Sequence, residues 1–239
     1  MNDHGSRREN ALSAAPIKEK TSISNSAVDA LIESCQNSIR AKQELLQKRE
    51  QLEAFGNAVE SIISSYRGGG RLYIAGNGGS AADAQHLAAE LVTNSAFSRL
   101  PLPAEALTVD TSIITAISND YGYENVFARQ LSVKARKGDT FLGITTSGNS
   151  ENIIKALRQC RKMKVCSILF CGRDGGAAMA LADFCVIAPG VSTATIQELH
   201  SVFLHTLYEC VEGAFLRDSA SLAPHAGTLA DTLNSTHER

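Results

Sequence analysis

The sequence lacks several features that would place it in a membrane, secreted or nucleic-acid-binding class. No apolar run approaches the ~18–20 residues that a membrane-spanning helix needs, and the first twenty residues contain no continuous hydrophobic segment typical of a secretory signal. The formal net charge is −2 at pH 7, so no overall positive field attracts nucleic acid or an anionic membrane. We therefore expect a soluble, cytoplasmic protein that binds neither.

The six cysteines also lack the spacing of a disulfide or metal framework. None of them occurs in a Cys-x-x-Cys pair, and they are too widely spaced for a disulfide scaffold. Several lie within apolar runs, which predicts reduced thiols in the core of a cytoplasmic protein. The six are Cys35, Cys160, Cys166, Cys171, Cys185 and Cys210.

What the sequence does contain is typical of a globular protein. Of its 239 residues, 44% are hydrophobic and 20% are charged, which provides enough apolar side chains for one sizeable core. Residues 1–22 and 219–239 are polar and show no hydrophobic periodicity. We expect them to be flexible tails on either side of one domain over residues 23–218.

Two segments before residue 70 have the periodicity of amphipathic helices. Apolar residues recur at helical spacing from Val28 to Ile39 and again from Leu52 to Tyr66, and the second segment ends at three glycines, residues 68–70. We therefore predict two long helices before the first strand. Because helices of this kind often pack against another subunit, they also suggest an oligomer.

After residue 70, short apolar runs alternate with helical patterns, which predicts an α/β fold with a parallel sheet and helices on both of its faces. The predicted strands are Leu72–Ala75, Ala104–Val109, Thr140–Ile144, Val165–Phe170 and Phe184–Ile187. The predicted helices lie near residues 80–94, 112–118, 124–136, 150–161 and 195–216. In such sheets ligands bind at the carboxyl ends of the strands, so we expect the chemistry there.

The first strand-to-helix connection lies within RLYIAGNGGSAADAQH, residues 71–86, and places backbone N–H groups where an anion could bind. It formally fits G-x-G-x-x-A, a dinucleotide fingerprint with Asp110 as the acidic residue, but nothing else in the sequence supports a dinucleotide. His86 and Glu90 are four residues apart and share one face of the next helix. A solvated surface contact is the alternative interpretation of this pair.

The connection after the third predicted strand is rich in hydroxyl groups. Thr145, Thr146, Ser147 and Ser150 lie within six residues, beside a glycine and at the start of a helix. They can present O–H and N–H donors to one phosphate without a cationic side chain. Ser150 alone would suffice as a helix N-cap, but a cap does not require the other three hydroxyls. We therefore interpret the segment as a phosphate cradle.

Other polar segments are less specific. Asn119 and Asp120 lie in a turn-like stretch, and residues 172–176 form another turn at the end of a strand. The polar residues of the last predicted helix include Gln197, His200 and His205. A histidine on an apolar helix is usually a core residue, so neither histidine by itself indicates a site.

Taken in order, four motifs closely resemble the phosphoheptose (sedoheptulose 7-phosphate) isomerases of the sugar isomerase superfamily. They are GNGGSAADAQHLAAEL, TAISNDYGYENVFARQ, LGITTSGNS and IQELHSVFLH, and the resemblance covers roughly residues 25–216. It implies a three-layer α/β/α sandwich around a parallel sheet of about five strands, and a homotetramer joined by the N-terminal helices. It also implies conversion of sedoheptulose 7-phosphate to D-glycero-D-manno-heptose 7-phosphate through an enediolate, the first step towards nucleotide-activated heptoses.

Carried over position by position, the resemblance assigns a role to each polar segment. The residues implied in substrate binding are Asn77, Gly78, Gly79, Ser80, Glu90, Asn119, Asp120 and Gln197. Those implied in holding the substrate phosphate are Thr145, Thr146, Ser147 and Ser150. One zinc ion per subunit is implied at His86, Glu90, Gln197 and His205. Glu90 and His205 also match the acid–base pair of the family.

The sequence departs from the family pattern at two positions. The usual E-L-x-G-R is E-L-V-T-N at residues 90–94, so Asn94 replaces an arginine. Ala194 stands where some members carry an aspartate near the active site. A substrate contact and a helper in proton transfer are thereby missing, which affects the expected rate or substrate preference more than the reaction class.

The implied roles agree with the chemistry of the side chains. Burial and neighbouring charge can bring the pKa of a carboxylate or an imidazole close to neutral pH. Glu90 as base and His205 as acid therefore suit proton transfer between adjacent carbons. Zinc accepts imidazole, carboxylate and amide-oxygen ligands, and Mn, Fe or Ni would accept the same set. Zinc could polarise the carbonyl or stabilise the enediolate. Because a zinc-bound glutamate is a weaker base than a free one, the alternative is a metal that organises or even inhibits the site rather than one that catalyses.

The spacing of Gln197 and His205 sets a condition on a shared metal site. Eight residues of an ideal helix span about 12 Å, which is the limit for two side chains that reach one ion. We therefore predict that Gln197 lies at the irregular start of its helix, or that the site is completed across a subunit interface. His200 is the competing ligand, and we interpret it as structural.

Three alternatives remain at the level of function. A non-catalytic scaffold of the same superfamily would bind another protein, but it has no need of the complete hydroxyl and metal-ligand sets. An isomerase of another phosphosugar is closer, because a phosphate cradle does not measure chain length. A nicotinamide-dependent dehydrogenase is the third. The sequence leaves open whether the heptose supplies a surface polysaccharide or a secondary metabolite.

Overall fold

The computed structural model describes residues 20–93 and 101–221, with side chains described within residues 26–93 and 101–216. Most of both predicted tails, and Asn94, therefore lie outside the described residues. The chain divides into two compact units, one ending at Gln36 and one starting at Asn37, and each is described by itself.

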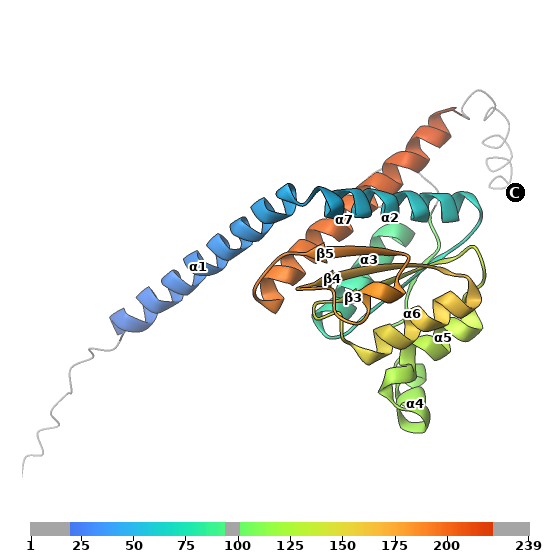
Figure 1. Cartoon of the computed structure of the whole chain (residues 1–239), viewed down its shortest axis with the longest axis horizontal. Helices are drawn as coiled ribbons and strands as arrows, with labels where there is room; N and C mark the ends of the chain where they lie inside the picture. The colour runs from blue at the N-terminus through green and yellow to red at the C-terminus, as the bar shows by residue number, and fades with distance from the viewer. Residues whose placement is uncertain (1–19, 94–100, 222–239) are drawn as a thin grey trace, which may run out of the picture. The chain divides into compact units, whose positions relative to one another are not determined.

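The elements follow the predicted alternation of helices and strands (Figure 1). The helices are α1 (Lys20–Gln47), α2 (Arg49–Arg67), α3 (Gly79–Thr93), α4 (Thr111–Tyr121), α5 (Val126–Lys134), α6 (Glu151–Met163) and α7 (Thr193–Ser221), with short 3-10 turns η1 (Tyr123–Asn125) and η2 (Met179–Leu181). The strands are β1 (Leu72–Gly76), β2 (Ala104–Ala106), β3 (Thr140–Thr145), β4 (Cys166–Gly172) and β5 (Phe184–Ala188). Each predicted strand and helix has a counterpart.

The five described strands form one parallel sheet in the order β2-β1-β3-β4-β5. β1 and β3 are neighbours, with Leu72 opposite Thr140 and Gly76 opposite Ile144. The connections that follow these two strands therefore start side by side at the carboxyl edge of the sheet. The predicted parallel sheet of about five strands is confirmed.

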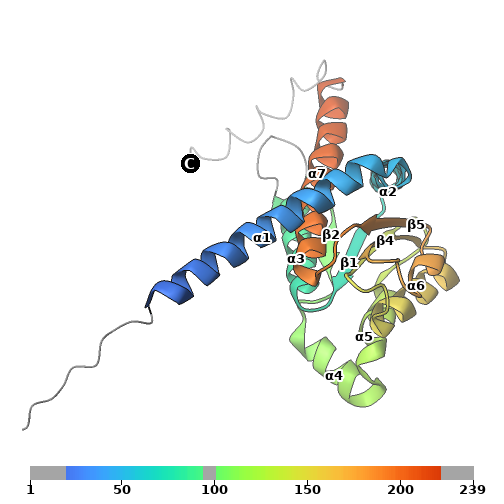
Figure 2. The same cartoon turned by 60° about the vertical axis from the view of Figure 1, so that its left-hand side comes forward.

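Alternate residues of β1 enter two hydrophobic clusters on opposite faces of the sheet. Leu72 and Ile74 pack with apolar residues of α2, α3 and α7, whereas Tyr73 and Ala75 pack with those of α5 and α6. Figure 2 shows α3 and α7 on one side of the sheet and α5 and α6 on the other. This arrangement is the three-layer α/β/α sandwich that the resemblance implies.

β2 is shorter than predicted, because it ends at Ala106 rather than at Val109. Val109 is 56% exposed, and the next residue already caps α4: the Asp110 carboxylate accepts a hydrogen bond of 2.9 Å from the Ile113 N–H. The last residues of the apolar run are therefore used to turn the chain from the strand into the helix.

The two N-terminal helices are present, and they bury their apolar residues unequally. On α1, Val28, Leu31 and Ile32 are 50–65% exposed. α2 contributes a row of buried residues to the core: Ala58, Val59, Ile62, Ile63 and Tyr66. None of the described helices combines the length and the apolar character that a membrane crossing requires.

The prediction of core cysteines is correct for only part of the set. All six thiols are free; two are buried, two are partly buried and two are exposed. The exposed ones are Cys35 on α1 and Cys210 on α7. An apolar neighbourhood in the sequence does not fix which face of a helix a residue occupies, so the prediction was wrong for these two.

Candidate functional site

The glycine-rich and hydroxyl-rich connections are joined at the carboxyl edge of the sheet. Asn77, the first residue after β1, and Asn152, near the start of α6, exchange two amide hydrogen bonds of 2.9 and 2.8 Å. The two residues are 75 positions apart in the sequence. The two loops therefore form neighbouring sides of one site.

The glycine-rich loop lies close against its surroundings. Gly78 has a φ of +57°, a left-handed conformation that favours glycine. A Cβ on Gly76 would lie 2.4 Å from the Ser80 carbonyl oxygen, and a Cβ on Gly79 would lie 2.2 Å from Nε2 of Gln197. Without these side chains, α3 starts directly after the strand and its first N–H groups lie at the site. Ser80 itself is only 3% exposed.

Two of the four hydroxyl groups of the predicted phosphate cradle lie close together, and a third accepts a hydrogen bond within the loop. Thr145 Oγ1 lies 3.0 Å from Ser150 Oγ, and Ser147 Oγ accepts a hydrogen bond of 3.1 Å from the Asn149 N–H. Ser150 occupies the N-cap position of α6, but its side chain makes no capping hydrogen bond. The structure therefore gives no support to a capping role for this hydroxyl. Hydroxyls gathered at the N-terminus of a helix of 13 residues suit a phosphate dianion.

The turn at residues 172–176 packs against this hydroxyl-rich loop. Gly148 has a φ of +67°, and a Cβ there would lie 2.0 Å from the Gly175 carbonyl oxygen. The Ala178 N–H donates to the Gly148 carbonyl at 2.9 Å, and the Ala177 N–H donates to Asn149 Oδ1 at 3.0 Å. A turn whose role the sequence left open thus supports the phosphate cradle.

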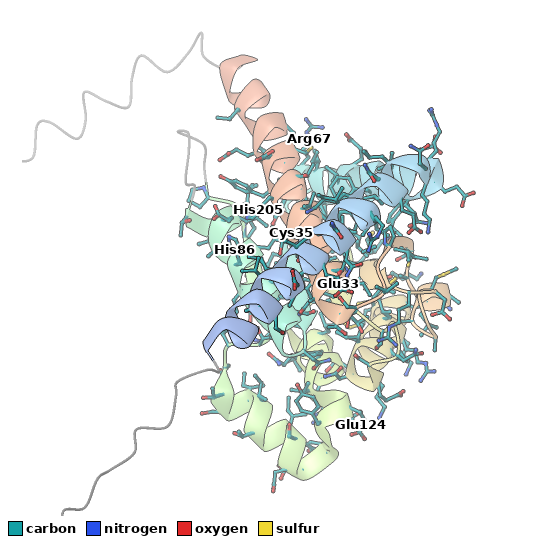
Figure 3. The ribbon with its side chains drawn as sticks, turned by 90° about the vertical axis from the view of Figure 1, so that its left-hand side faces the viewer. Glu33, Cys35, Arg67, His86, Glu124 and His205 are labelled. Carbon is teal, nitrogen blue, oxygen red and sulfur yellow. The ribbon has the colours of Figure 1, made fainter. Side chains whose placement is uncertain are left out.

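A second group of predicted site residues meets between α3 and α7. His86 Nε2 lies 3.3 Å from Glu90 Oε1, and the rings of His86 and His205 stand edge to face with their centroids 5.1 Å apart. Figure 3 shows the two histidines close together on these helices. Glu90 and His205 line the same small cavity. Three of the four predicted metal ligands therefore lie together within one chain.

Asp83, one turn before His86 on α3, adds a further carboxyl group to this region. Burial raises the pKa of Asp83, and the nearby His86 opposes that shift. Its Oδ2 atom is buried and has no hydrogen-bond partner among the described residues. A carboxyl group beside a histidine can hold the imidazole in the orientation that a metal requires.

The structure excludes one of the two explanations for the spacing of Gln197 and His205. α7 is already regular from Thr193, because the Ser192 hydroxyl accepts a hydrogen bond of 3.1 Å from the Thr195 N–H. Gln197 therefore does not lie at an irregular helix start, and that prediction was wrong. Its amide lies against Gly79, whereas His205 meets His86 two turns further along.

The side chains around His86 are of the types that bind zinc, but they are not arranged as a zinc site in this structure. Within the part of the chain that the structure describes, no group of three or more His, Cys, Asp or Glu side chains is arranged to hold a metal. Two imidazoles and a carboxylate nevertheless lie close together, which is the donor set that zinc prefers. Binding would therefore require the rings to turn toward a common point.

His200 stands apart from this cluster. It is completely buried, and its Nε2 lies 3.0 Å from the Cys171 carbonyl oxygen. Burial lowers the pKa of His200 to about 4, against the opposing effect of that hydrogen bond. These contacts agree with the structural role inferred for it.

The remaining predicted residues lie at the edge of the site. Asn119 and Asp120 are exposed near the end of α4, and Asn119 Nδ2 donates a hydrogen bond of 2.8 Å to Asp120 Oδ1. Tyr123, just beyond them, was not predicted as a site residue, although its hydroxyl donates to Asn77 Oδ1 at 2.9 Å. Asn152 was not predicted as a site residue either, and its only signal in the sequence is its place two residues after Ser150. Ala194 is exposed in the first turn of α7.

Comparison with known proteins places these features in a family. Residues 34–171 match the family model of the SIS domain. The phosphoheptose isomerase of Aneurinibacillus thermoaerophilus is 46% identical over 183 residues, which cover 77% of this chain and 92% of that protein. Phosphoheptose isomerase 2 of Campylobacter jejuni is 47% identical over 176 residues, which cover 74% of this chain and 88% of that protein.

Solved structures agree with the sequence comparison. The phosphoheptose isomerase of Neisseria gonorrhoeae matches with a TM-score of 0.73 and 38% identity, covering 78% of this chain and 99% of that one. The enzyme of Francisella tularensis matches with a TM-score of 0.74 and 34% identity, covering 77% and 97%. With the fold, the two loops and these relatives in agreement, the chain belongs to the phosphoheptose isomerase family of SIS-domain proteins.

Proposed function

We propose that the chain converts sedoheptulose 7-phosphate to D-glycero-D-manno-heptose 7-phosphate, an aldose–ketose isomerisation that starts the synthesis of nucleotide-activated heptoses. The observation that carries the proposal is the pairing of Asn77 with Asn152, because it joins the hydroxyl-rich loop to the glycine-rich loop from which α3 leads to Glu90. The phosphate cradle and the sugar-binding loop then belong to one site, and α3 leads from that site to the acid–base pair. The names of the relatives support the same activity.

In this proposal the substrate phosphate binds at the start of α6. Thr145, Thr146, Ser147 and Ser150 supply the donors, together with N–H groups of the first helical turn. The sugar hydroxyls lie toward the second loop and the helices that flank it. The residues proposed to contact them are Asn77, Gly78, Gly79, Ser80, Asn119, Asp120 and Gln197.

Glu90 and His205 carry the proton transfers. Glu90 removes a proton from the carbon beside the ketose carbonyl and returns it to the former carbonyl carbon, which makes the aldose. His205 moves the accompanying proton between the two oxygens of the enediolate. Their shared cavity and the half-buried position of Glu90 support these roles.

We further propose one zinc ion per subunit, held by His86, Glu90 and His205 with Gln197 as the fourth ligand. When bound, zinc supplies a Lewis acid that can polarise the substrate carbonyl. The closeness of three of the donors supports the proposal. Completion of the site by Gln197 across a subunit interface stays a prediction.

A homotetramer is part of the same proposal. On α1 the apolar side chains Val28, Leu31 and Ile32 are exposed. Because contact between apolar side chains and water is unfavourable, these residues favour burial against another subunit. Sedimentation of the purified protein measures the state directly, and a monomer at working concentration would contradict the proposal.

The activity is tested with purified protein and a panel of ketose phosphates that includes sedoheptulose 7-phosphate. We expect the heptose aldose as the main product, identified by chromatography against standards. Glu90→Gln and His205→Asn keep similar shapes but remove the acid–base groups, so turnover should fall by about 10²–10⁴-fold. Glu53→Gln, on an exposed position of α2, serves as the control.

Other outcomes of this assay correspond to the alternative functions. Turnover of a different ketose phosphate alone would identify another phosphosugar isomerase. No turnover of any member of the panel, with zinc supplied, would favour a binding scaffold and overturn the proposal.

A further inference from the structure

We propose that Asn152 and Tyr123 are positioning residues that orient the amide of Asn77 for substrate binding, an inference that rests on the proposed isomerase function. The two residues come from separate segments: Tyr123 opens η1, and Asn152 is the second residue of α6. Both bind the side chain of Asn77 in the loop after β1. We call these three residues the amide clamp.

The hydrogen bonds of the clamp fix what Asn77 can offer to a ligand. Its Oδ1 accepts from Asn152 Nδ2 at 2.8 Å and from the Tyr123 hydroxyl at 2.9 Å, so both lone pairs of that oxygen are used. Its Nδ2 donates one proton to Asn152 Oδ1 at 2.9 Å. The second N–H has no partner among the described residues. Asn77 therefore presents a donor, and its partner in the substrate must be an oxygen that accepts, such as a phosphate or carbonyl oxygen.

The two positioning residues differ in how firmly they are held. Asn152 is 3% exposed, and a buried amide must be hydrogen-bonded to be stable. Tyr123 is 52% exposed, so water can replace its hydroxyl. We therefore expect Asn152 to be the main anchor of the Asn77 amide and Tyr123 the weaker one.

A second contact between the same elements supports the clamp. Lys155, one turn after Asn152 on α6, lies with its Nζ 3.3 Å from Glu124 Oε1 and 3.2 Å from Asn125 Oδ1. η1 is thus attached to α6 directly as well as through Asn77. This attachment holds Tyr123 at a fixed distance from the phosphate-binding end of the helix.

The physical consequence is preorganisation. The terminal torsion of an asparagine side chain is broad, so a free Asn77 amide would sample many orientations. If substrate binding had to fix a free amide, the lost entropy would weaken the affinity. The clamp fixes the amide before the substrate binds, so this cost does not arise on binding. Its loss should therefore raise KM and leave kcat nearly unchanged, since Asn77 binds substrate and transition state alike.

The test is a double-substitution cycle measured with sedoheptulose 7-phosphate. We expect Asn152→Ala to raise KM about tenfold with kcat within about threefold, and Tyr123→Phe to raise KM about threefold, as the loss of one or two hydrogen bonds implies. In an Asn77→Ala background, Asn152→Ala should have no further effect on KM. Arg158→Ala, on an exposed position of α6, is the control and should change neither value.

Equal effects of Asn152→Ala with and without Asn77 would overturn the proposal, because Asn152 would then act independently of that amide. If Asn152→Ala does not fold, the effect of Tyr123→Phe on KM is compared in the wild-type and Asn77→Ala backgrounds. An equal effect in both would overturn the proposal in the same way. The same double-substitution cycle can also be measured without substrate, as the change in the denaturant midpoint of unfolding. Non-additive midpoint shifts support the clamp and additive shifts contradict it, even if the wild-type protein does not act on sedoheptulose 7-phosphate and the proposed function fails.

Discussion

The side-chain amide of Gln197 lies directly against Gly79, so the beginning of α7 meets the beginning of α3 at the edge of the sheet. A Cβ on Gly79 would come within 2.2 Å of Gln197 Nε2 and 3.4 Å of Gln197 Oε1. Any side chain at position 79 must therefore move that amide. This contact connects the glycine-rich loop to a residue proposed to bind both sugar and zinc.

Gly79→Ala is predicted to lower activity without unfolding the protein. The new methyl group meets the flexible end of a side chain, so Gln197 can turn away at little cost in folding free energy. We expect kcat/KM to fall by about tenfold, which corresponds to about 1.4 kcal/mol of lost interaction. Steady-state kinetics and thermal unfolding of the same samples measure both effects.

Gly213→Ala is the matched control for that change. Gly213 also lies in a helix, α7, and a Cβ there meets nothing within 4 Å. It should leave kcat/KM unchanged and raise the free energy of unfolding by about 0.5–1 kcal/mol, since alanine is the better helix former. Equal kinetics for Gly79→Ala and wild type would show that the position of Gln197 is unimportant for activity.

Ser150→Ala separates the phosphate cradle from a helix cap. Because the Ser150 hydroxyl bonds the buried Thr145 hydroxyl rather than the backbone of α6, its removal should lower the free energy of unfolding only by the ~0.5–1.5 kcal/mol of one side-chain hydrogen bond. The KM for a phosphorylated ketose should rise about tenfold, through the loss of a hydrogen bond to a charged group. Urea unfolding and kinetics on the same variant measure the two quantities.

A true cap provides the comparison. The Asp110 carboxylate accepts from the Ile113 N–H at 2.9 Å, so Asp110→Ala should lower the free energy of unfolding by about 1 kcal/mol. If Ser150→Ala destabilises the protein as much as Asp110→Ala does and leaves KM unchanged, the cradle interpretation fails.

The buried His200 predicts a loss of stability in mild acid. Burial lowers its pKa to about 4 in the folded protein, while the unfolded chain has the ordinary value near 6.5. Between these values the unfolded state binds the proton and the folded state does not, so stability falls as the pH drops below about 6.5. We expect the free energy of unfolding to fall by about 2 kcal/mol at pH 5 and by about 3 kcal/mol below pH 4 from this group. Urea unfolding at pH 7 and at lower pH measures the loss.

His200→Gln isolates this effect from the other titrating groups. Glutamine keeps an amide N–H that can donate to the Cys171 carbonyl, but it has no charged form. The variant should lose less stability than the wild type between pH 7 and pH 5. Parallel pH profiles of the two proteins would contradict the assignment of a buried neutral imidazole.

The sequence predicted the elements of this fold well because most of them leave local patterns. β1 and β3 are mostly apolar, buried along their whole length, and both were located to within one residue. Contacts between distant residues leave no such pattern. The bond between Asn77 and Asn152 depends on β1 and β3 being neighbours in the sheet, and nothing local to either residue indicates it.

The same limit explains the errors at element ends. The start of α7 was expected near residue 195, and the hydroxyl of Ser192 moves it upstream, which places Gln197 in regular helix. Val109 continued an apolar run, yet Asp110 had to cap the next helix. In each case one polar side chain decides a boundary that hydrophobic periodicity cannot locate.

Removal of zinc tests whether the cluster of His86, Glu90 and His205 holds a metal. We expect protein stripped with a chelator to have a lower thermal midpoint than protein with zinc added back, because a ligand that binds only the folded state stabilises it. Metal content, measured by elemental analysis, should approach one zinc per subunit. Activity should fall on stripping and return with zinc.

His86→Ala should lose both the bound zinc and the zinc-dependent rise in the thermal midpoint, because it removes a ligand that touches both other members of the cluster. His200→Gln should keep both, since His200 faces the Cys171 carbonyl and not this cluster. Full activity in protein free of metal would exclude a Lewis-acid role and leave Glu90 unligated, which makes it the stronger base. Zinc binding without any gain in turnover would assign the metal an organising role.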